Sequence, residues 1–301
     1  MPEPPYTIFD IQPQWVLEPE ALGSKEKFWY RVKDGEPEWL FKFPQSNTGQ
    51  HWAEKIAAEV AACLRLLHAQ VEFAVFNGTR GSGSESFSRK GRDLYHGNQV
   101  LAGTVLGYDP HKSFRHSDHT LTNIFAALDG VFVLPGSAQR IKTRLAGYLV
   151  LDALIGNTDR HHENWGILRK RVGEGWEGIL APTFDHASSL GRELVDISPG
   201  KCRQRILQEG RVGTYAEKAT GAIFWDKTDR RGMSPLELVR RGAALHPTLF
   251  KPALARLQRL ERERIQAIVD RVPADWMSAL AREFAVELMC YNYNELQKVR
   301  L

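Results

Sequence analysis

The spacing of apolar residues divides this chain into a strand-rich N-terminal part and a mainly helical remainder. Aromatic and β-branched runs predict strands over residues 28–33, 39–44 and 71–76. Between the second and third of these runs, apolar residues recur every four positions over 50–67, which is the spacing of a helix. We therefore expect an N-terminal lobe over residues 1–88, built from an antiparallel sheet and one helix.

The remainder, residues 89–301, is expected to form a larger helical lobe. It begins with an irregular stretch over 89–120. Helical patterns follow at 120–128, 141–154, 199–209, 215–224, 235–245, 252–272 and 273–301. Two short β-like runs, 165–168 and 178–181, interrupt them. The pattern predicts an α+β fold with two lobes.

The most informative stretch follows the apolar segment 145–156. Asp159 and Asn164 lie directly after it, five positions apart, and a second apolar run ends at Asp185. Two acids and an amide at the ends of buried segments suit chemistry with Mg²⁺ and phosphate, which needs rigidly held oxygen ligands. The spacing D-x-x-x-x-N is that of the kinase catalytic loop, in which the aspartate accepts a proton and the asparagine holds a metal.

A plain turn is the alternative for this stretch, because Asp, Asn, Gly and Thr are common turn formers. D-x-x-x-x-N also arises by chance. Two features favour a site: the long apolar segment before the loop, and the β-like pair after it, which returns Asp185 to the loop.

Lys42 lies in an apolar strand between Phe41 and Phe43. Such a lysine either points to solvent or reaches a ligand phosphate. The following helix carries Glu54 and Glu59, and a strand lysine paired with a helix glutamate is how kinases place the lysine on the α- and β-phosphates. That order favours the phosphate role, but the sequence does not choose between the two glutamates.

The segment before the first hairpin, residues 22–27, is where a phosphate-covering loop is expected. It holds a single glycine, Gly23, so it is a weak glycine-rich motif. Lys25 and Lys27 supply charge there, either to a phosphate or simply to solvent.

Bulk properties exclude several classes of protein. The 43% hydrophobic and 25% charged residues are ordinary for a globular protein, and the net charge of +4 does not demand nucleic acid. Three scattered cysteines argue for a reducing compartment and against a disulfide framework. The N-terminal residues lack signal-peptide features, and the apolar runs are too short to span a bilayer. We expect a cytoplasmic protein without membrane contact or direct nucleic-acid binding.

Histidines offer a metal site as a competing hypothesis. His96, His111, His116 and His119 lie in the irregular stretch without an evident set of carboxylate partners. His161 and His162 are adjacent and diverge, so they cannot pair as in H-E-x-x-H. We expect His161 to orient the loop by hydrogen bonds and His162 to pack or face solvent.

A lysine-bearing strand and a glutamate-bearing helix precede two motifs, IGNTDRHHENWGIL and LAPTFDHASSLG. This order resembles that of the HipA-like Ser/Thr protein kinases and, more distantly, that of phosphatidylinositol-kinase-like enzymes. The resemblance implies that Asp159 is the catalytic base, Asn164 and Asp185 are Mg²⁺ ligands, and Lys42 is the ATP lysine. The family's G-x-x-E-K loop resembles residues 23–27, which adds Gly23, Ser24 and Lys27 to the expected nucleotide site.

The function that this resemblance implies is transfer of the γ-phosphate of ATP to Ser/Thr hydroxyls of a protein substrate, in a toxin-type kinase with a possible antitoxin partner. The chain resembles the shorter members, without the N-terminal small domain. Glu20 stands near the position where some members autophosphorylate a serine, so control by that route is not expected. The alternatives are a lipid or small-molecule kinase, a nucleotide-binding pseudokinase or scaffold, and a metal hydrolase built on His161 and His162.

Overall fold

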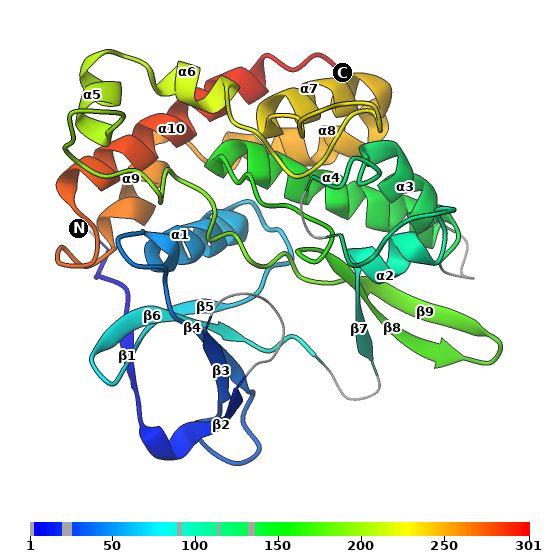
Figure 1. Ribbon diagram of the computed structural model, residues 1–301, viewed down its shortest axis with the longest axis horizontal. Coiled ribbons are helices and arrows are strands. Elements are labelled where there is room, and N and C mark those ends of the chain that lie inside the picture. Colours follow the sequence, from blue (N-terminus) through cyan, green and yellow to red (C-terminus); the bar gives the residue numbers. More distant parts are fainter. Residues whose placement is uncertain (1–2, 20–25, 89–91, 113–114, 132–135) are drawn as a thin grey trace.

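A six-stranded sheet forms the N-terminal part of the computed structural model, which describes residues 3–19, 26–88, 92–112, 115–131 and 136–301. The strand order is β1-β5-β6-β4-β3-β2, and only β1 and β5 pair in parallel. The strands are β1 (Ile8–Ile11), β2 (Val16–Pro19), β3 (Lys27–Tyr30), β4 (Trp39–Lys42), β5 (Val71–Phe76) and β6 (Thr79–Glu85). The sheet curls, so that β1 and β2 approach each other through the short 3-10 helix η1 (Pro13–Trp15) (Figure 1).

Helix α1 (Gln50–Cys63) lies between this sheet and the helical part (Figure 1). Its apolar side is fully buried, because Ala53, Ile56 and Val60 are all 0% exposed. The helix ends four residues before the predicted position. Arg65 adopts a positive φ of 53°, and the backbone N–H of Leu66 donates to the Ala61 carbonyl at 2.9 Å, which is a Schellman ending.

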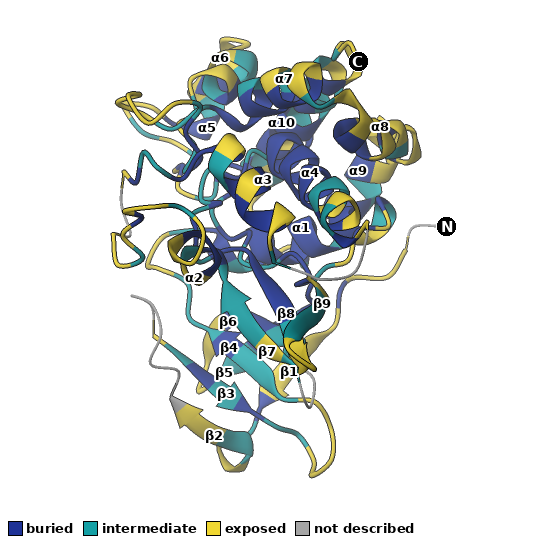
Figure 2. Ribbon diagram, turned by 90° about the vertical axis from the view of Figure 1, so that its right-hand side faces the viewer, coloured by how far each residue is buried: buried dark blue, intermediate teal, exposed yellow. Residues whose placement is uncertain are grey.

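The helical part is built around two 19-residue helices, α4 (Ser137–Ile155) and α10 (Ala279–Gln297), which are largely buried (Figure 2). The other helices are α2 (Gly97–Ala102), α3 (Leu121–Asp129), α5 (Arg203–Gln208), α6 (Val212–Glu217), α7 (Pro235–Leu245), α8 (Pro247–Arg256) and α9 (Arg262–Asp270). Each packs with its neighbours around one hydrophobic core that also includes α1. None of the helices in the described ranges is long and apolar enough to cross a membrane.

The prediction of a single helix over 252–272 is wrong. The chain instead forms α8, a 3-10 turn η2 (Leu257–Arg259) and α9. Leu260, between the last two, leaves the helical region with φ −126° and ψ 68°. This break allows both Leu257 and Leu260 to be fully buried, so tertiary packing overrides the local helical pattern.

The stretch predicted as irregular, 89–120, contains β7 (Asp93–His96) and α2. Strand β7 pairs with β8 (Gly166–Val172), which forms a hairpin with β9 (Gly175–Leu180). That hairpin confirms the β-like pair seen in the sequence, and it carries the chain from the loop at 157–164 back toward Asp185. The lobe boundary at 88/89 stays a prediction.

Candidate active site

The loop after α4 is fixed by a buried ion pair. Asp152, in the last turns of α4, and Arg160 are each 3% exposed. Nε and Nη2 of Arg160 donate to the two carboxylate oxygens of Asp152, each at 2.7 Å. Asn157 adds bonds to the same aspartate through its backbone N–H and its side-chain amide, both at 2.8 Å. A bidentate, desolvated pair of this kind holds the loop in one geometry.

Arg160 also joins this loop to the segment that precedes Asp185. Its Nη2 donates to Thr183 Oγ1 at 3.0 Å, and its Nη1 donates to the carbonyl oxygens of Asn164 and Phe184. One guanidinium therefore sets the separation between the two stretches that the sequence singled out.

Asp159 and Asn164 are brought together by a direct bond. The side-chain amide of Asn164 donates to the Asp159 carbonyl oxygen at 2.7 Å, which leaves the amide oxygen as the group that can ligate a metal. Asn164 is 5% exposed, whereas the side chain of Asp159 is 44% exposed. A solvent-facing carboxylate beside a buried amide is what a base acting on an incoming hydroxyl requires.

His161 lies beside Asp159, with its Nε2 3.9 Å from Asp159 Oδ1. Its Nδ1 accepts a bond from the Glu163 backbone N–H at 3.2 Å, which is consistent with an Nε2 proton facing the aspartate. His162 is 1% exposed, and its Nδ1 lies 2.8 Å from the Tyr108 hydroxyl. Burial lowers the pKa of His162 to about 4, so it packs as a neutral ring.

Lys42 and Asp185 meet across the two parts of the fold. Lys42, at the end of β4, has its Nζ 3.4 Å from Asp185 Oδ2, and the side chains are 14% and 31% exposed. Asp185 adopts a positive φ of 56°, an unusual conformation for a residue other than glycine, and such outliers concentrate at functional sites.

Glu54 completes this charge cluster from α1. It is 1% exposed, and its Oε1 accepts from the His186 backbone N–H at 3.0 Å. Burial opposes the charged forms of both Glu54 and Lys42. The opposite charges prevail: Asp185 and Glu54 raise the pKa of Lys42, while Lys42 and His186 lower the pKa of Glu54. The two carboxylates thus favour the protonated form of the lysine.

Glu59, the other glutamate that the sequence offered, lies on another face of α1. Its Oε1 is 2.7 Å from Lys55 Nζ, which also binds Glu72 Oε2 at 2.9 Å. We therefore remove Glu59 from the candidate site. Gly23 and Ser24 lie outside the described residues, and Lys27 stands directly opposite Lys42 in the pairing of β3 with β4.

No group of three or more His, Cys, Asp or Glu side chains that could hold a metal occurs in the part of the chain that the structure describes. Three histidines do gather near the loop, but their rings pack against one another. The ring centroid of His162 lies 5.4 Å from that of His116 and 6.0 Å from that of His119. The Asn164 amide and the Asp185 carboxylate fit a different kind of site, in which Mg²⁺ takes one or two protein oxygens and completes its shell with phosphate and water.

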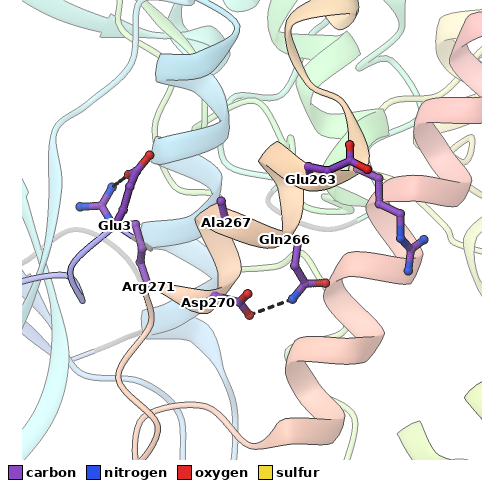
Figure 3. A pocket seen from close by; sticks show the side chains of 7 residues that line it. Glu3, Glu263, Gln266, Ala267, Asp270 and Arg271 are labelled. Carbon is purple, nitrogen blue, oxygen red and sulfur yellow. Dashed lines mark hydrogen bonds and ion pairs between the residues drawn. The ribbon is translucent and has the colours of Figure 1, made fainter. Parts of the chain in front are cut away.

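A surface hollow lies elsewhere, between the N-terminal segment and α9 (Figure 3). Glu3 accepts a bond from Arg271 there at 3.0 Å, and Gln266 donates to Asp270 at 2.8 Å. None of the candidate site residues lines this hollow.

The model of the HipA-like C-terminal domain matches residues 20–276. The chain belongs to this family. A curated relative, the serine/threonine-protein kinase CtkA of Helicobacter pylori strain J99, is 27% identical over 173 residues, which cover 56% of this chain and 48% of CtkA. The chain therefore spans about half the length of the curated relative that it matches.

Solved structures show the same fold. The proinflammatory kinase CtkA of H. pylori superposes with a TM-score of 0.75 at 18% identity, over 98% of this chain and 100% of that one. A chain from the Shewanella oneidensis MR-1 toxin–antitoxin complex of HipA, HipB and operator DNA gives a TM-score of 0.60 at 14% identity, over 94% and 67%. The two-lobed, kinase-like α+β fold of this HipA-like chain is confirmed.

Sequence reasoning missed the residues that support the site. Asp152 could have been singled out, because it is the one acidic residue within the apolar run 145–156. Arg160 stood in the D-R-H motif without an assigned role. Three residues after Asp185 gave no sign of a role in the sequence. In the fold, His186 contacts Glu54 and Ser188 contacts Asp159. Arg192 contacts Ser188.

Proposed function

We propose that this chain is an ATP- and magnesium-dependent kinase that transfers the γ-phosphate to a serine or threonine hydroxyl of a protein substrate. The observation that carries the proposal is the meeting of Lys42 and Asp185 at 3.4 Å, next to a loop in which Asn164 is oriented and Asp159 is exposed. The kinship with CtkA, named as a serine/threonine-protein kinase, supports the substrate class.

Each residue has a distinct part in this proposal. Lys42, kept protonated by Asp185 and Glu54, binds phosphate oxygens of the nucleotide. Asn164 and Asp185 supply oxygen ligands for the metal, which neutralises phosphate charge when it is bound. Asp159 accepts the proton of the attacking hydroxyl, and His161 lies where it can orient that carboxylate.

The rate enhancement in such a site comes mainly from positioning and electrostatics. The buried Asp152–Arg160 pair serves positioning, because it fixes the loop before any ligand arrives. The Lys42–Asp185–Glu54 cluster serves electrostatics, because it places a desolvated cation beside a metal-binding carboxylate.

The test is transfer of label from γ-labelled ATP with Mg²⁺ in a cell lysate, using the wild type and Asp159→Asn. We expect label on this protein or on lysate proteins with the wild type, and none with the variant. Label found on lipids or small molecules would move the acceptor class to that alternative. Nucleotide binding without any transfer by the wild type would favour a pseudokinase.

Control by an antitoxin-type protein is a second part of the proposal, supported by the fold shared with HipA, whose crystal also holds HipB and operator DNA. Its test is co-purification of the tagged protein with products of neighbouring genes. Placement in the cytoplasm and lack of direct nucleic-acid contact stay predictions.

A further inference from the structure

Arg192 lies beside the candidate site and is joined to both parts of the fold. Its backbone carbonyl accepts from the N–H of Gly49, just before α1, at 2.9 Å. Its Nη1 donates to Gln45 Oε1 at 3.2 Å, three residues beyond Lys42. The turn before it has two left-handed residues, Leu190 and Gly191, with φ of 56° and 67°. This backbone course brings the arginine back toward the catalytic loop.

The guanidinium is two hydrogen bonds away from the proposed base. Nη2 of Arg192 donates to Ser188 Oγ at 3.2 Å, and Ser188 Oγ donates to Asp159 Oδ2 at 3.4 Å. The Ser188 carbonyl also accepts from the Thr158 backbone N–H at 3.2 Å, which fixes this serine beside the loop. The Ser188 hydroxyl therefore occupies a position next to Asp159 where an acceptor hydroxyl has to bind.

Arg192 differs from the other arginines near the site in its partners. Arg160 is paired with Asp152, and Arg203 is paired with Asp196 at 2.7 Å. The side-chain partners found for Arg192 in the described ranges are neutral oxygens, and no carboxylate there lies within 4.0 Å of it. A guanidinium held by neutral groups beside a catalytic base keeps its charge for an anionic ligand, and phosphate is the anion that this planar fork binds best.

We propose that Arg192 binds the phosphoryl group during its transfer, and that Ser188 holds the guanidinium over Asp159 until an acceptor hydroxyl takes its place. This inference rests on the proposed kinase function and assigns a second cation to it. Lys42 would bind phosphates on the sheet side, and Arg192 would bind the γ-phosphoryl group on the acceptor side.

The chemical step places the arginine where charge is redistributed. The acceptor oxygen forms a bond to the γ-phosphorus, and the bond from that phosphorus to the β–γ bridging oxygen breaks. ADP leaves with the electron pair, and the acceptor proton goes to Asp159. The reacting atoms start about 3–3.5 Å apart, so the γ-phosphoryl group lies within reach of a side chain that already contacts the hydroxyl position.

The test compares the binding of Mg·ADP with that of Mg·ADP plus aluminium fluoride, which mimics the planar phosphoryl group, by isothermal titration. Arg192→Ala is expected to keep its ADP affinity within about threefold and to lose about 10- to 150-fold in affinity for the fluoride complex, the range of a charged hydrogen bond. Arg192→Lys, which keeps the charge but not the fork, should fall between. Arg211→Ala, an exposed arginine that is 65% accessible, is the control and should match the wild type.

A second readout is the transfer rate at saturating ATP, which should fall in Arg192→Ala while the KM for ATP stays nearly constant. Unchanged ADP affinity in the variant shows that it is folded. A wild type that transfers phosphate, with Arg192→Ala equal to it in both readouts, would overturn the role of Arg192 and leave the kinase function standing. A wild type that binds no nucleotide would overturn both.

Discussion

The two sides of the candidate site are built differently. On the helical side, the Asp152–Arg160 pair is buried and bidentate, and each oxygen of Asp152 accepts a bond from the guanidinium. On the sheet side, Lys42 and Asp185 meet at 3.4 Å, and Glu54 Oε2 is a buried oxygen without a hydrogen-bond partner among the described residues. Both oxygens of the buried acid on the helical side are thus hydrogen-bonded, whereas one oxygen of the buried acid on the sheet side is not.

The two sides are expected to contribute differently to stability and to ligand binding. A buried charge without full pairing destabilises a fold, so we expect the charges on the sheet side to contribute less to stability than the pair on the helical side. The proposed catalytic loop needs a fixed geometry, and the bonds between Asp152 and Arg160 provide it. We expect variants on the two sides to differ accordingly: those on the loop side should affect folding, and those on the nucleotide side should affect ligand use.

The largest expected effect is on catalysis at the loop itself. Asp159→Asn should lower kcat by about 10²- to 10⁴-fold, because the variant cannot accept the hydroxyl proton. Its melting temperature should stay near that of the wild type, since the side chain is 44% exposed. Steady-state phosphoryl transfer and thermal unfolding measure the two quantities. Glu163→Gln, in the same loop and 46% exposed, is the matched control. Full activity in Asp159→Asn would remove this residue from the mechanism.

The next effect is on stability. Asp152→Ala should lower the free energy of unfolding by about 3–5 kcal/mol, because it leaves the Arg160 charge buried and unpaired. Asp129→Ala breaks the surface pair with Lys142, whose aspartate is 59% exposed, and should cost about 1 kcal/mol or less. Urea unfolding of both variants tests the comparison. Equal, small losses would mean that the buried pair does not hold the loop.

On the nucleotide side, Lys42→Ala should weaken ATP use by about 1–3 kcal/mol through loss of a charge-assisted phosphate contact. It also removes a cation that lies 3.4 Å from the Asp185 carboxylate. Lys33→Ala, at an exposed position after β3, is the control. Nucleotide affinity and turnover are the readouts. If neither changes in Lys42→Ala, the lysine is structural and binds no phosphate.

The smallest effect concerns pH. Burial lowers the pKa of His119 to about 3 and of His162 to about 4, below the ordinary 6.5. The unfolded chain therefore binds protons before the folded one as the pH falls. Stability declines below about pH 6.5, down to about pH 4 for the contribution of His162 and about pH 3 for that of His119. Between pH 7.5 and 6.0 the loss should be about 1 kcal/mol per histidine at most.

Urea midpoints at these two pH values measure that loss. His162→Gln should show a smaller decline than the wild type, while the exposed His111→Gln should keep the full decline. A decline of the same size in all three proteins would show that His162 does not contribute to it.

Much of the site could be predicted because its residues follow strong local patterns. Asp159, Asn164 and Asp185 each lie at the end of an apolar run, and Lys42 lies in a clear strand. The choice between Glu54 and Glu59 could not be made, because both lie on one helix. The choice depends on which side of α1 faces β4, and tertiary packing decides this. The structure answers it through the pairing of Lys55 with Glu59.

Some features of the fold could not be predicted from the sequence, for physical reasons. Strand β1 shows no alternation, because three of its four residues are exposed at the edge of the sheet. The break at Leu260 follows from core packing rather than from local propensity. The Asp152–Arg160 pair joins residues eight positions apart across a helix end, which no strand or helix period reveals.

The most direct measurement is titration of a non-hydrolysable ATP analogue, with and without Mg²⁺, into the wild type, Asp185→Asn and Asp159→Asn. We expect Mg²⁺-dependent binding by the wild type, loss of that dependence in Asp185→Asn, and unimpaired binding by Asp159→Asn. Absence of binding by the wild type, or binding that is independent of both Mg²⁺ and Asp185, would contradict it.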